Sequence, residues 1–495
     1  MVSPVVLIAV PLALAFIIPL VGLLSQKATR YVPVIAMVFN CVIALQLLPR
    51  VLQEPVIVRT AGFAPPFSIH LVAGPLGVGL ALLVALIGLL VAIYAISYIH
   101  EGPIAKYHTL YLLLLTGATG MVLTGDLFNL FVFFEILCIS SYALVGYRGD
   151  KSGIESSAKY LIQGALGSSL VLIGIGFIYS QFGTLSMADI ARNVSSIRPM
   201  HIFISVAFLI TGFGVEAAIF PLNAWLPDAH SSAPSSISAI LSGLAIKAGL
   251  YAVARVIFTV FGAESILLLV VVVGVLTLLI GEMSAFSQDN IKRLLAYSSI
   301  GQIGLILFAL GLASEGGVQG ALFLVVSHAF AKATLFLSVG YMVYRTGSME
   351  ISSLDGMGKR MPLSSLCFTV GAFSLVGLPP FIGFPGKFMV IRAALAKTDM
   401  LFTVLTGIVL LGTVVEGAYF FRIVQGLFFR SEPENIEEKP EEVLSMPFSA
   451  LLPVCLLAFA IIAVGIYPQL LTDLIEPAAT DLLDRAAYIQ HVFGG

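Results

Sequence analysis

Several lysine and glutamate residues lie deep inside long apolar segments of this sequence, where a charge is costly. Lys247 and Lys332 are each more than ten residues from either end of such a segment. Half a membrane helix is roughly 15 Å long, too far for a lysine side chain to reach water. A charge at the centre of a bilayer costs at least ~2.5–3.5 kcal/mol, so these groups must face the protein interior, pair with one another or contact water. The candidate pathway residues are Glu135, Glu216, Lys247, His328, Lys332, Lys387 and Glu416.

The spacing of these residues indicates a proton or ion relay. His328 precedes Lys332 by four residues, so both side chains lie on one helix face about one turn apart. Glu135 is surrounded by aromatic residues, and Glu216 lies five residues before Pro221. A structural ion pair is the simpler explanation for any one buried charge. A set spread over separate apolar segments favours ion transport, the usual role of ionisable groups inside membrane spans.

The elements that must position these residues are membrane-spanning helices. Hydrophobic residues make up 59% of the 495 residues, charged residues 11%, and the mean hydropathy is +1.05. A soluble chain of this size needs far more polar surface. A spanning helix needs about 20 mostly apolar residues. The predicted spans are 4–24, 31–51, 73–98, 108–124, 127–147, 157–182, 202–222, 236–261, 266–287, 292–312, 317–345, 363–389 with a break, 402–428 and 447–471.

The distribution of basic residues over the loops predicts the orientation. One set of loops carries about twice as many as the other, so the positive-inside rule places both termini outside the cytoplasm. The acidic stretch 432–442 is then expected in a cytoplasmic loop. Residues 1–24 have no basic residue before their apolar run and are interpreted as a retained helix. The richer set contains Lys27, Arg30, Lys106, Arg148, Lys151, Lys292, Arg293, Arg345, Lys359, Arg360, Arg422, Arg430 and Lys439, and the poorer set Arg50, Arg59, Arg192, Arg198, Lys397 and Arg485.

Several other kinds of chemistry have no motif in this sequence. The four cysteines occur singly within apolar segments, without a Cys-x-x-Cys pair or a Cys/His cluster of metal-ligand spacing. No glycine-rich phosphate-binding loop followed by lysine is present, which argues against direct use of ATP. No basic tract indicates nucleic-acid binding. We therefore expect no redox centre or metal site in this chain.

Two of the predicted spans are interrupted by proline and glycine. Pro221 interrupts one, and Pro379 and Pro380 interrupt another 158 positions later (379 − 221). Proline breaks a helix, and the freed backbone groups must face protein or a water-filled cavity. Matching breaks in two halves of a chain indicate an inverted repeat with a transport site between the halves. The predicted units are N-terminal helices at 1–107, a five-helix repeat at 108–261, a second at 262–430, and a loop with a last helix at 431–495.

Two motifs resemble a known superfamily. Residues 125–135 (GDLFNLFVFFE) resemble the fifth-helix motif of Mrp-type cation/proton antiporter D subunits, and residues 220–230 (FPLNAWLPDAH) resemble the loop after their broken seventh helix. Related elements occur in antiporter-like subunits of respiratory complex I and of membrane-bound hydrogenases and their sulfur-reducing relatives. The similarity extends from the fourth helix onward. It implies fourteen helices with two inverted five-helix repeats.

The resemblance also implies roles for individual residues. A half-channel opens to each side near one broken helix, and water-linked protonatable groups join the two. The matching positions are Glu135 for the fifth-helix glutamate, Lys247 for the eighth-helix lysine, His328 and Lys332 for the eleventh-helix relay, and Lys387 for the twelfth-helix lysine.

One position departs from this pattern. Where the family usually has a lysine that partners the fifth-helix glutamate, this chain has Glu216. Three arrangements are open: one carboxyl of the Glu135/Glu216 pair holds a proton, Lys247 neutralises the pair, or a cation lies between the two carboxylates. We expect the substitution to change the coupling or the ion carried. The chain also ends soon after its last predicted span, which argues against the complex I subunit that carries a long lateral helix.

The sequence therefore predicts an all-α polytopic membrane protein with about fourteen transmembrane helices, two inverted five-helix repeats and two broken helices. The expected function is that of a proton-translocating, antiporter-like subunit of a redox-driven membrane-bound hydrogenase or sulfur-reducing respiratory complex, with Na⁺/H⁺ exchange left open. The segment 354–362 favours the hydrogenase type over the alternative, a D-type subunit of an Mrp antiporter. A stand-alone carrier of a small metabolite is disfavoured, because the sequence has no arginine deep in a span that would bind an organic anion. A structural anchor is disfavoured because it would not need central charges.

The resemblance further implies partners and a location. We expect other antiporter-like and small hydrophobic membrane subunits, and a peripheral arm that carries iron–sulfur clusters and, in a hydrogenase, nickel and iron. The transported ions are H⁺ and, in the exchange alternative, Na⁺. The expected location is the plasma membrane of a prokaryote. The redox cofactors lie in the partner subunits and none is expected in this chain.

Overall fold

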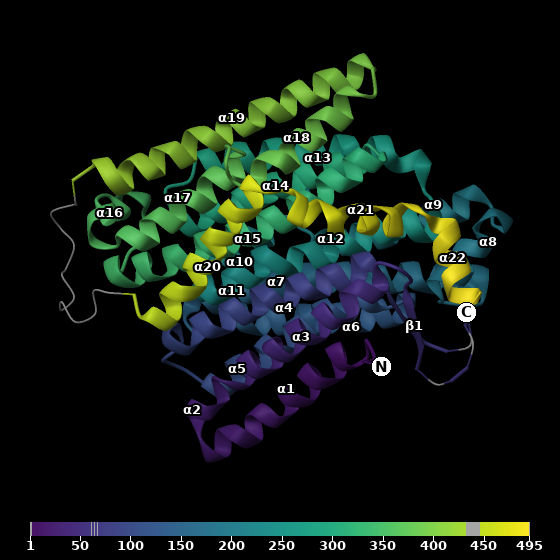
Figure 1. The fold of residues 1–495 in the computed structure, drawn as a ribbon, viewed down its shortest axis with the longest axis horizontal. Helices are drawn as coiled ribbons and strands as arrows, with labels where there is room; N and C mark the ends of the chain where they lie inside the picture. The colour runs from purple at the N-terminus through teal and green to yellow at the C-terminus, as the bar shows by residue number, and fades with distance from the viewer. Residues whose placement is uncertain (1, 61, 64, 67, 432–445, 495) are drawn as a thin grey trace.

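The protein is a bundle of long, roughly parallel helices, as its computed structural model shows (Figure 1). The structure describes residues 2–60, 62–63, 65–66, 68–431 and 446–494. Within this part of the chain, twelve helices are long and apolar enough to cross a membrane. The prediction of an all-α polytopic membrane protein is confirmed. The helix at 104–123 and the interrupted helix at 362–395 lie where two further spans were predicted but are not among the twelve.

The N-terminal part forms one edge of the bundle, and its helices begin within two residues of the predicted spans. A short antiparallel hairpin, in which Val56 pairs with Ala73, connects the third helix to the fourth. Pro75 starts the fourth helix, a position that proline favours because the first helical N–H has no partner there. The elements are α1 (Val6–Leu24), α2 (Gln26–Thr29), α3 (Val32–Val51), β1 (Val56–Arg59), β2 (His70–Ala73) and α4 (Pro75–Tyr98).

The next part contains the first broken helix. The side chains of Asp126 and Asp150 accept hydrogen bonds from backbone N–H groups in the first turns of α6 and α7, and such caps fix where the helices begin. One π-helical segment interrupts the helix at 235–261, and a second forms its C-terminal end. The elements are α5 (Ile104–Leu123), α6 (Leu127–Val145), α7 (Lys151–Phe182), α8 (Met187–Asn193), α9 (Pro199–Glu216), α10 (Trp225–Ser232), α11 (Ser235–Ile240), a π segment (Leu241–Ala245), α12 (Ile246–Ala254) and a π segment (Arg255–Phe261).

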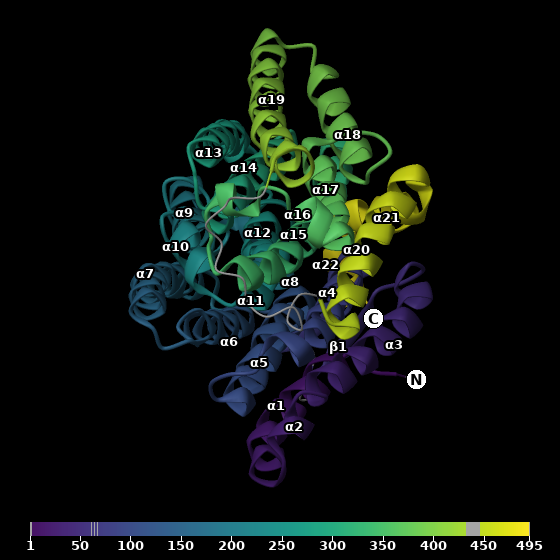
Figure 2. The same ribbon diagram turned by 90° about the vertical axis from the view of Figure 1, so that its left-hand side faces the viewer.

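The following part contains the second broken helix. Asn290, Ser314 and Asp399 cap α14, α15 and α19 with their side chains. Figure 2 views the bundle nearer to end-on, with α13, α14 and α15 in sequence across it and α19 at the outer edge. The elements are α13 (Leu267–Phe286), α14 (Ile291–Gly311), α15 (Glu315–Thr346), α16 (Met357–Arg360), α17 (Pro362–Val376), α18 (Gly383–Leu395) and α19 (Met400–Phe429).

The C-terminal part differs from the prediction. The predicted span 447–471 is too long, because α20 (Phe448–Ile466) stops before Pro468. Two unpredicted helices follow, α21 (Gln469–Leu483) and α22 (Arg485–Phe493). α21 packs against α4 and α15, and α22 packs against α8 near the C-terminus of the chain (Figure 1). The predicted acidic loop at 432–442 lies outside the described residues.

Three helices are enclosed by the rest of the protein. In the most apolar window of Ser235–Phe261, of α14 and of α15, 94% of the residues are buried, against 28% in α1 and in α19. The outer helices present their remaining apolar side chains outward, as expected at a lipid boundary. Lys247, His328 and Lys332 all lie on the enclosed helices, so their charges face protein and not lipid.

Candidate ion pathway

The two helix breaks open the backbone inside the protein. The first lies between the end of α9 and the start of α10 and contains Pro221; the second lies between α17 and α18 and contains Pro379 and Pro380. Side chains satisfy carbonyls freed at both places: the Trp225 indole N–H donates to the carbonyl of Val215 at 2.8 Å. In the second break the Lys387 amine donates to the carbonyl of Val376 at 3.2 Å. Each break therefore brings backbone dipoles into contact with a polar side chain.

Glu216, the last residue of α9, lies in a buried pocket of neutral donors. The Tyr160 hydroxyl donates to its two carboxyl oxygens, at 2.8 and 3.0 Å, and the Cys138 thiol donates at 3.4 Å. The Tyr160 ring stacks flat on the Trp225 ring, with centroids 3.7 Å apart. Because Trp225 begins the second half of the broken helix, this stack joins the carboxyl site to the break.

Glu135 lies on the neighbouring face of α6 and is half-buried. The Ser168 hydroxyl of α7 donates to its carboxyl, and this carboxyl lies near enough to Glu216 for the two groups to influence each other. Among the described residues neither glutamate has a basic partner, and the Lys247 amine instead donates to the carbonyl of Ser242. The arrangement in which Lys247 neutralises the pair therefore does not occur in this structure. The arrangements with a shared proton or a bound cation both stay open.

Lys247 is the second residue after the π segment Leu241–Ala245. A π-helical turn disturbs the regular backbone bonding of a helix and often marks a functional site. Here the Ser242 carbonyl accepts from the Lys247 amine, and the Ser242 hydroxyl lies 2.8 Å from that of Ser299 on α14. The lysine thus has only neutral contacts among the described residues, in a site that joins α12 to α14.

His328 and Lys332 lie on one face of α15, as their spacing predicts. The Lys332 amine is fully buried and donates to the carbonyl of Leu295 and to the hydroxyl of Ser298, both at 2.8 Å. Neither ring nitrogen of His328 has a hydrogen-bond partner in the described part of the protein, and the same holds for the buried His230. Two buried imidazoles with unused nitrogens are sites at which water or a moving proton would bind.

Lys387 and Glu416 form a buried ion pair, with 2.7 Å between the amine and a carboxyl oxygen. The second carboxyl oxygen accepts from the Gln302 amide at 2.7 Å. α18, α19 and α14 each contribute one of these three groups. This is the one place in the described structure where two of the predicted pathway residues bond directly to each other.

Sequence reasoning missed Glu282, a buried carboxylate on α13. Its side chain accepts from the Tyr419 hydroxyl at 2.8 Å, and its charge interacts with that of Glu416. A signal was present: Glu282 lies five residues inside its predicted span, and a short acidic side chain cannot reach water over that distance. Tyr419 carried no such signal, because tyrosine is common in apolar helices.

The prediction that Lys292 lies in a loop was wrong. It lies in the first turn of α14, 1% exposed, and its amine donates to the carbonyl of Ala233 at 2.6 Å. Helix α10 ends next to the first turn of α14, so a residue near a predicted span end is covered by a neighbouring element. Sequence position alone cannot reveal such coverage.

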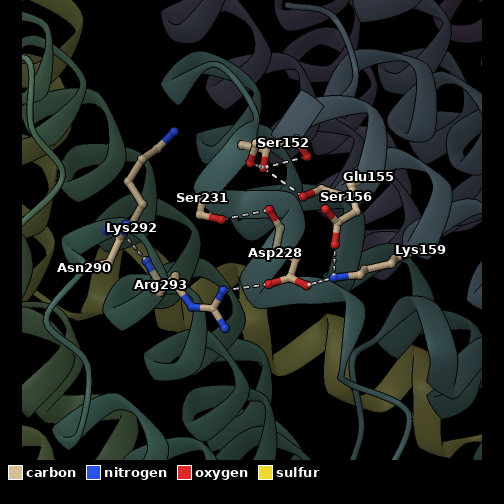
Figure 3. Close-up of polar contacts among 10 residues, drawn as sticks. Ser152, Glu155, Ser156, Lys159, Asp228, Ser231, Asn290, Lys292 and Arg293 are labelled. Carbon is tan, nitrogen blue, oxygen red and sulfur yellow. Dashed lines mark hydrogen bonds and ion pairs between the residues drawn. The ribbon is translucent and has the colours of Figure 1, made fainter. Parts of the chain in front are cut away.

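A charged cluster around Asp228 fixes α10 between two other helices (Figure 3). One Asp228 oxygen bonds Arg293 of α14 at 2.7 Å, and the other bonds Lys159 of α7 at 3.0 Å. Lys159 also pairs with Glu155 one turn earlier at 2.8 Å. Figure 3 shows Arg293 directed to Asp228 and its neighbour Lys292 pointing away. The cluster is partly exposed, and it positions the broken helix at one end of the bundle.

The ionisable groups form a row that passes through the enclosed helices. It begins at Glu135 on α6 and Glu216 on α9, passes Lys247 on α12 and the His328/Lys332 face of α15, and ends at the Lys387–Glu416 pair of α18 and α19. Carboxyl, amine and imidazole groups exchange protons, and hydroxyls can pass them on. The arrangement suits movement of protons or small cations by changes of charge.

Comparison with known proteins places this arrangement in a family. The NADH:quinone oxidoreductase/Mrp antiporter transmembrane family matches residues 124–412. A chain in the structure of the membrane-bound sulfane sulfur reductase, an archaeal respiratory membrane complex, superposes with a TM-score of 0.92 and 38% identity, covering 99% of this chain and 100% of that one.

Two sequence relatives agree with this placement. The N-type subunit of the NADH-quinone oxidoreductase of Desulforudis audaxviator is 32% identical over 96% of this chain and 98% of its own length. The D-type subunit of the Na⁺/H⁺ antiporter of Bacillus subtilis is 31% identical over 87% of each chain. The chain therefore belongs to the NADH:quinone oxidoreductase/Mrp antiporter family, as an antiporter-like membrane subunit.

Proposed function

We propose that this chain translocates protons as the antiporter-like subunit of a redox-driven respiratory membrane complex of the sulfur-reducing or hydrogenase type. The observation that carries the proposal is the row of ionisable groups that passes through the enclosed helices and ends in the buried Lys387–Glu416 pair. A structural role alone does not account for two buried lysines, Lys247 and Lys332, that have only neutral partners among the described residues.

Charge coupling along the row gives the chain a means of transport. Protonation of Glu416 would neutralise its carboxylate and leave the Lys387 ammonium unbalanced. The positive charge of Lys387 would then act on Lys332 across a medium of low dielectric constant, where charges interact strongly. A change imposed at one end of the row by a partner subunit would thus reach the other end as a series of proton steps.

The similarity to the sulfane sulfur reductase chain supports the respiratory type. That chain shares 38% identity and nearly full mutual coverage with this one, against 31% for the D-type antiporter subunit. On this basis we assign iron–sulfur clusters, and in a hydrogenase nickel and iron, to a peripheral arm of partner subunits. The excess of basic residues in one set of loops supports placing both termini outside the cytoplasm of a prokaryotic cell.

A D-type subunit of an Mrp antiporter is the second candidate. The Glu135/Glu216 pair favours it, because two carboxylates without a basic partner among the described residues suit a hard cation such as Na⁺. Exchange of Na⁺ for H⁺ at this pair would make the chain part of a gradient-driven machine. The comparison with the B. subtilis protein, which is named for Na⁺/H⁺ exchange, supports this alternative.

Purification of the native complex separates the two candidates. The tagged chain is isolated in mild detergent, its partners are identified by mass, and bound iron and nickel are measured. Iron–sulfur subunits would support the respiratory type. Small hydrophobic subunits without metal would overturn it in favour of the Mrp type. Reconstitution into vesicles with a pH-sensitive dye then tests transport itself: a complex that moves no ion with either driving force would refute both.

A further inference from the structure

Glu282 is buried in a space that a glycine on the neighbouring helix provides. It lies on α13, is 2% exposed, and faces α14 at Gly301. A Cβ at Gly301 would collide with the Glu282 carboxyl oxygen. The carboxyl is therefore seated against the helix backbone, in a space that no other residue type at position 301 would provide.

A line of side-chain contacts connects Glu282 to Lys332. The Lys332 amine donates to the Ser298 hydroxyl at 2.8 Å. The Tyr419 hydroxyl lies near enough to the Ser298 side chain for the two to interact, and it donates to Glu282 at 2.8 Å. Ser298 thus accepts on the side of Lys332, and Tyr419 donates on the side of Glu282. This polarity is the one required for a proton to pass from the lysine to the carboxylate.

We propose that Glu282 is a proton-accepting residue of the pathway, loaded from Lys332 through Ser298 and Tyr419, and that it relays protons toward the Lys387–Glu416 pair. In the transfer, the Lys332 ammonium loses a proton to the Ser298 oxygen, Ser298 passes its own proton to Tyr419, and Tyr419 passes its own to Glu282. One O–H bond forms and one breaks at each hydroxyl. The inference rests on the proposed function, since it assumes that protons move along this row.

The charges around Glu282 allow this transfer inside the protein. The charged groups that interact with it are Glu416 on α19, Lys387 on α18 and Lys332 on α15. Before transfer, two lysine cations balance two carboxylates. After transfer, Lys332 and Glu282 are both neutral, and the Lys387–Glu416 pair remains. The net local charge is zero in both states, so the step avoids placing an unbalanced charge in the low-dielectric interior.

The test compares variants of the intact complex in sealed vesicles, with proton movement followed by a pH-sensitive dye. Glu282→Gln keeps the acceptor for Tyr419 but cannot be protonated, and Tyr419→Phe removes the hydroxyl link. Loss of a proton-transfer group typically costs a factor of 10² or more, so we expect at least roughly tenfold slower transport in both, with an altered pH profile. The matched controls are Glu264→Gln, an exposed glutamate just before α13, and Tyr111→Phe, which removes a buried hydroxyl bonded to the Gly88 carbonyl.

The outcomes separate this inference from the proposed function. Wild-type rate and pH profile in Glu282→Gln, with transport abolished in Glu416→Gln, would overturn the role of Glu282 and leave the function standing. Absence of ion movement by the wild-type complex would overturn the function itself. If Glu282→Gln prevents assembly, Tyr419→Phe and Ser298→Ala decide the matter: wild-type rates in both would overturn the relay, and slowed rates in assembled complexes would support it.

Discussion

At the scale of single residues, the buried bases fall into two kinds. Lys387 has a carboxylate partner, whereas Lys247 and Lys332 contact only carbonyl and hydroxyl oxygens among the described residues. A buried pair is costly to break from one side, because the remaining charge then lacks a partner. A buried lysine with neutral partners has less to lose when its proton leaves. The two lysines with neutral partners are therefore the groups suited to changing state, and the pair is suited to sensing that change.

The first residue-scale prediction concerns the pair. Replacing Glu416 by Gln leaves Lys387 without its counter-charge and should destabilise the protein by about 3–5 kcal/mol if the lysine stays charged. The double variant Lys387→Met with Glu416→Gln should recover much of that loss, while remaining inactive in transport. Thermal unfolding of the purified protein gives the comparison. Equal stability of the single and double variants would contradict a direct ion pair.

A second residue-scale prediction concerns Glu216. Its carboxyl receives hydrogen bonds from Tyr160 and Cys138 and interacts with the charge of Glu135. Glu216→Gln can still accept these bonds, so we expect a folded, assembled complex whose transport rate and pH dependence both change. The measurement is vesicle transport over a range of pH and of Na⁺ concentration. Unchanged profiles in both series would show that the substitution has no part in coupling.

The burial of most of the predicted pathway residues was predictable, because a charge inside an apolar run is a strong signal. The sequence could not show their partners. Tyr160, Tyr419 and Gln302 come from helices far away in the chain, and their residue types are unremarkable in a membrane span. Lys292 shows a second kind of error. It lies at the end of a predicted span, where exposure is expected, but a helix distant in sequence covers it. The position of a charged residue within an apolar run can be read from the neighbouring sequence, whereas its partners depend on how distant helices pack.

At the scale of elements, the first broken helix is held by aromatic and charged contacts. Trp225 stacks on Tyr160 and bonds back to the carbonyl of Val215, while Asp228 ties α10 to α7 and α14. The proline-rich segment was predictable as a break from its composition alone. The two π segments and the end of α20 were not, because backbone register within a helix depends on what the neighbouring helices require.

The element-scale prediction concerns Trp225. Trp225→Phe keeps an aromatic ring against Tyr160 but leaves the buried Val215 carbonyl without its donor, which should cost roughly 1–3 kcal/mol. Tyr160→Phe retains the stack and removes the hydroxyl from Glu216, so it should affect transport more than stability. Trp225→Phe should lower the unfolding midpoint more than Tyr160→Phe does, and Tyr160→Phe should slow transport into vesicles more than Trp225→Phe does. If one variant had the larger effect in both measurements, this division of roles would be contradicted.

At the scale of the whole molecule, the last two helices connect parts of the bundle that are distant in sequence. The Leu482 carbonyl accepts from Thr259, Asp481 accepts from the Leu76 backbone N–H, and the Tyr488 ring lies under the Arg255 guanidinium at 4.6 Å. Burial of Asp481 raises its pKa, and Arg255 opposes that effect. The fold class was predictable from composition, but this C-terminal closure was not, since short helices after the last apolar span carry a weak signal.

The prediction at this scale concerns Tyr488. Tyr488→Ala removes the ring beneath a buried arginine and leaves a cavity, so we expect a loss of about 3–5 kcal/mol, the usual cost for a buried aromatic residue. Tyr488→Phe keeps the ring and should be close to the wild type. Limited proteolysis together with thermal unfolding would report the loosened C-terminal helices. An alanine variant as resistant as the phenylalanine one would contradict a stabilising role for this contact.

The π segment before Lys247 has a consequence for the contact that this lysine makes. A π-helical turn holds one more residue than an α-helical turn, so it acts as a one-residue insertion in a helix whose ends are fixed by its neighbours. Deleting Gly243 would remove the inserted residue and restore regular α-helical bonding, while the parts of the helix on its two sides kept their directions. The Ser242 carbonyl, to which the Lys247 amine now donates, would then return to the backbone bonding of the helix. The contact of this lysine thus depends on a count of residues in the turn that precedes it, although every predicted pathway side chain would still be present.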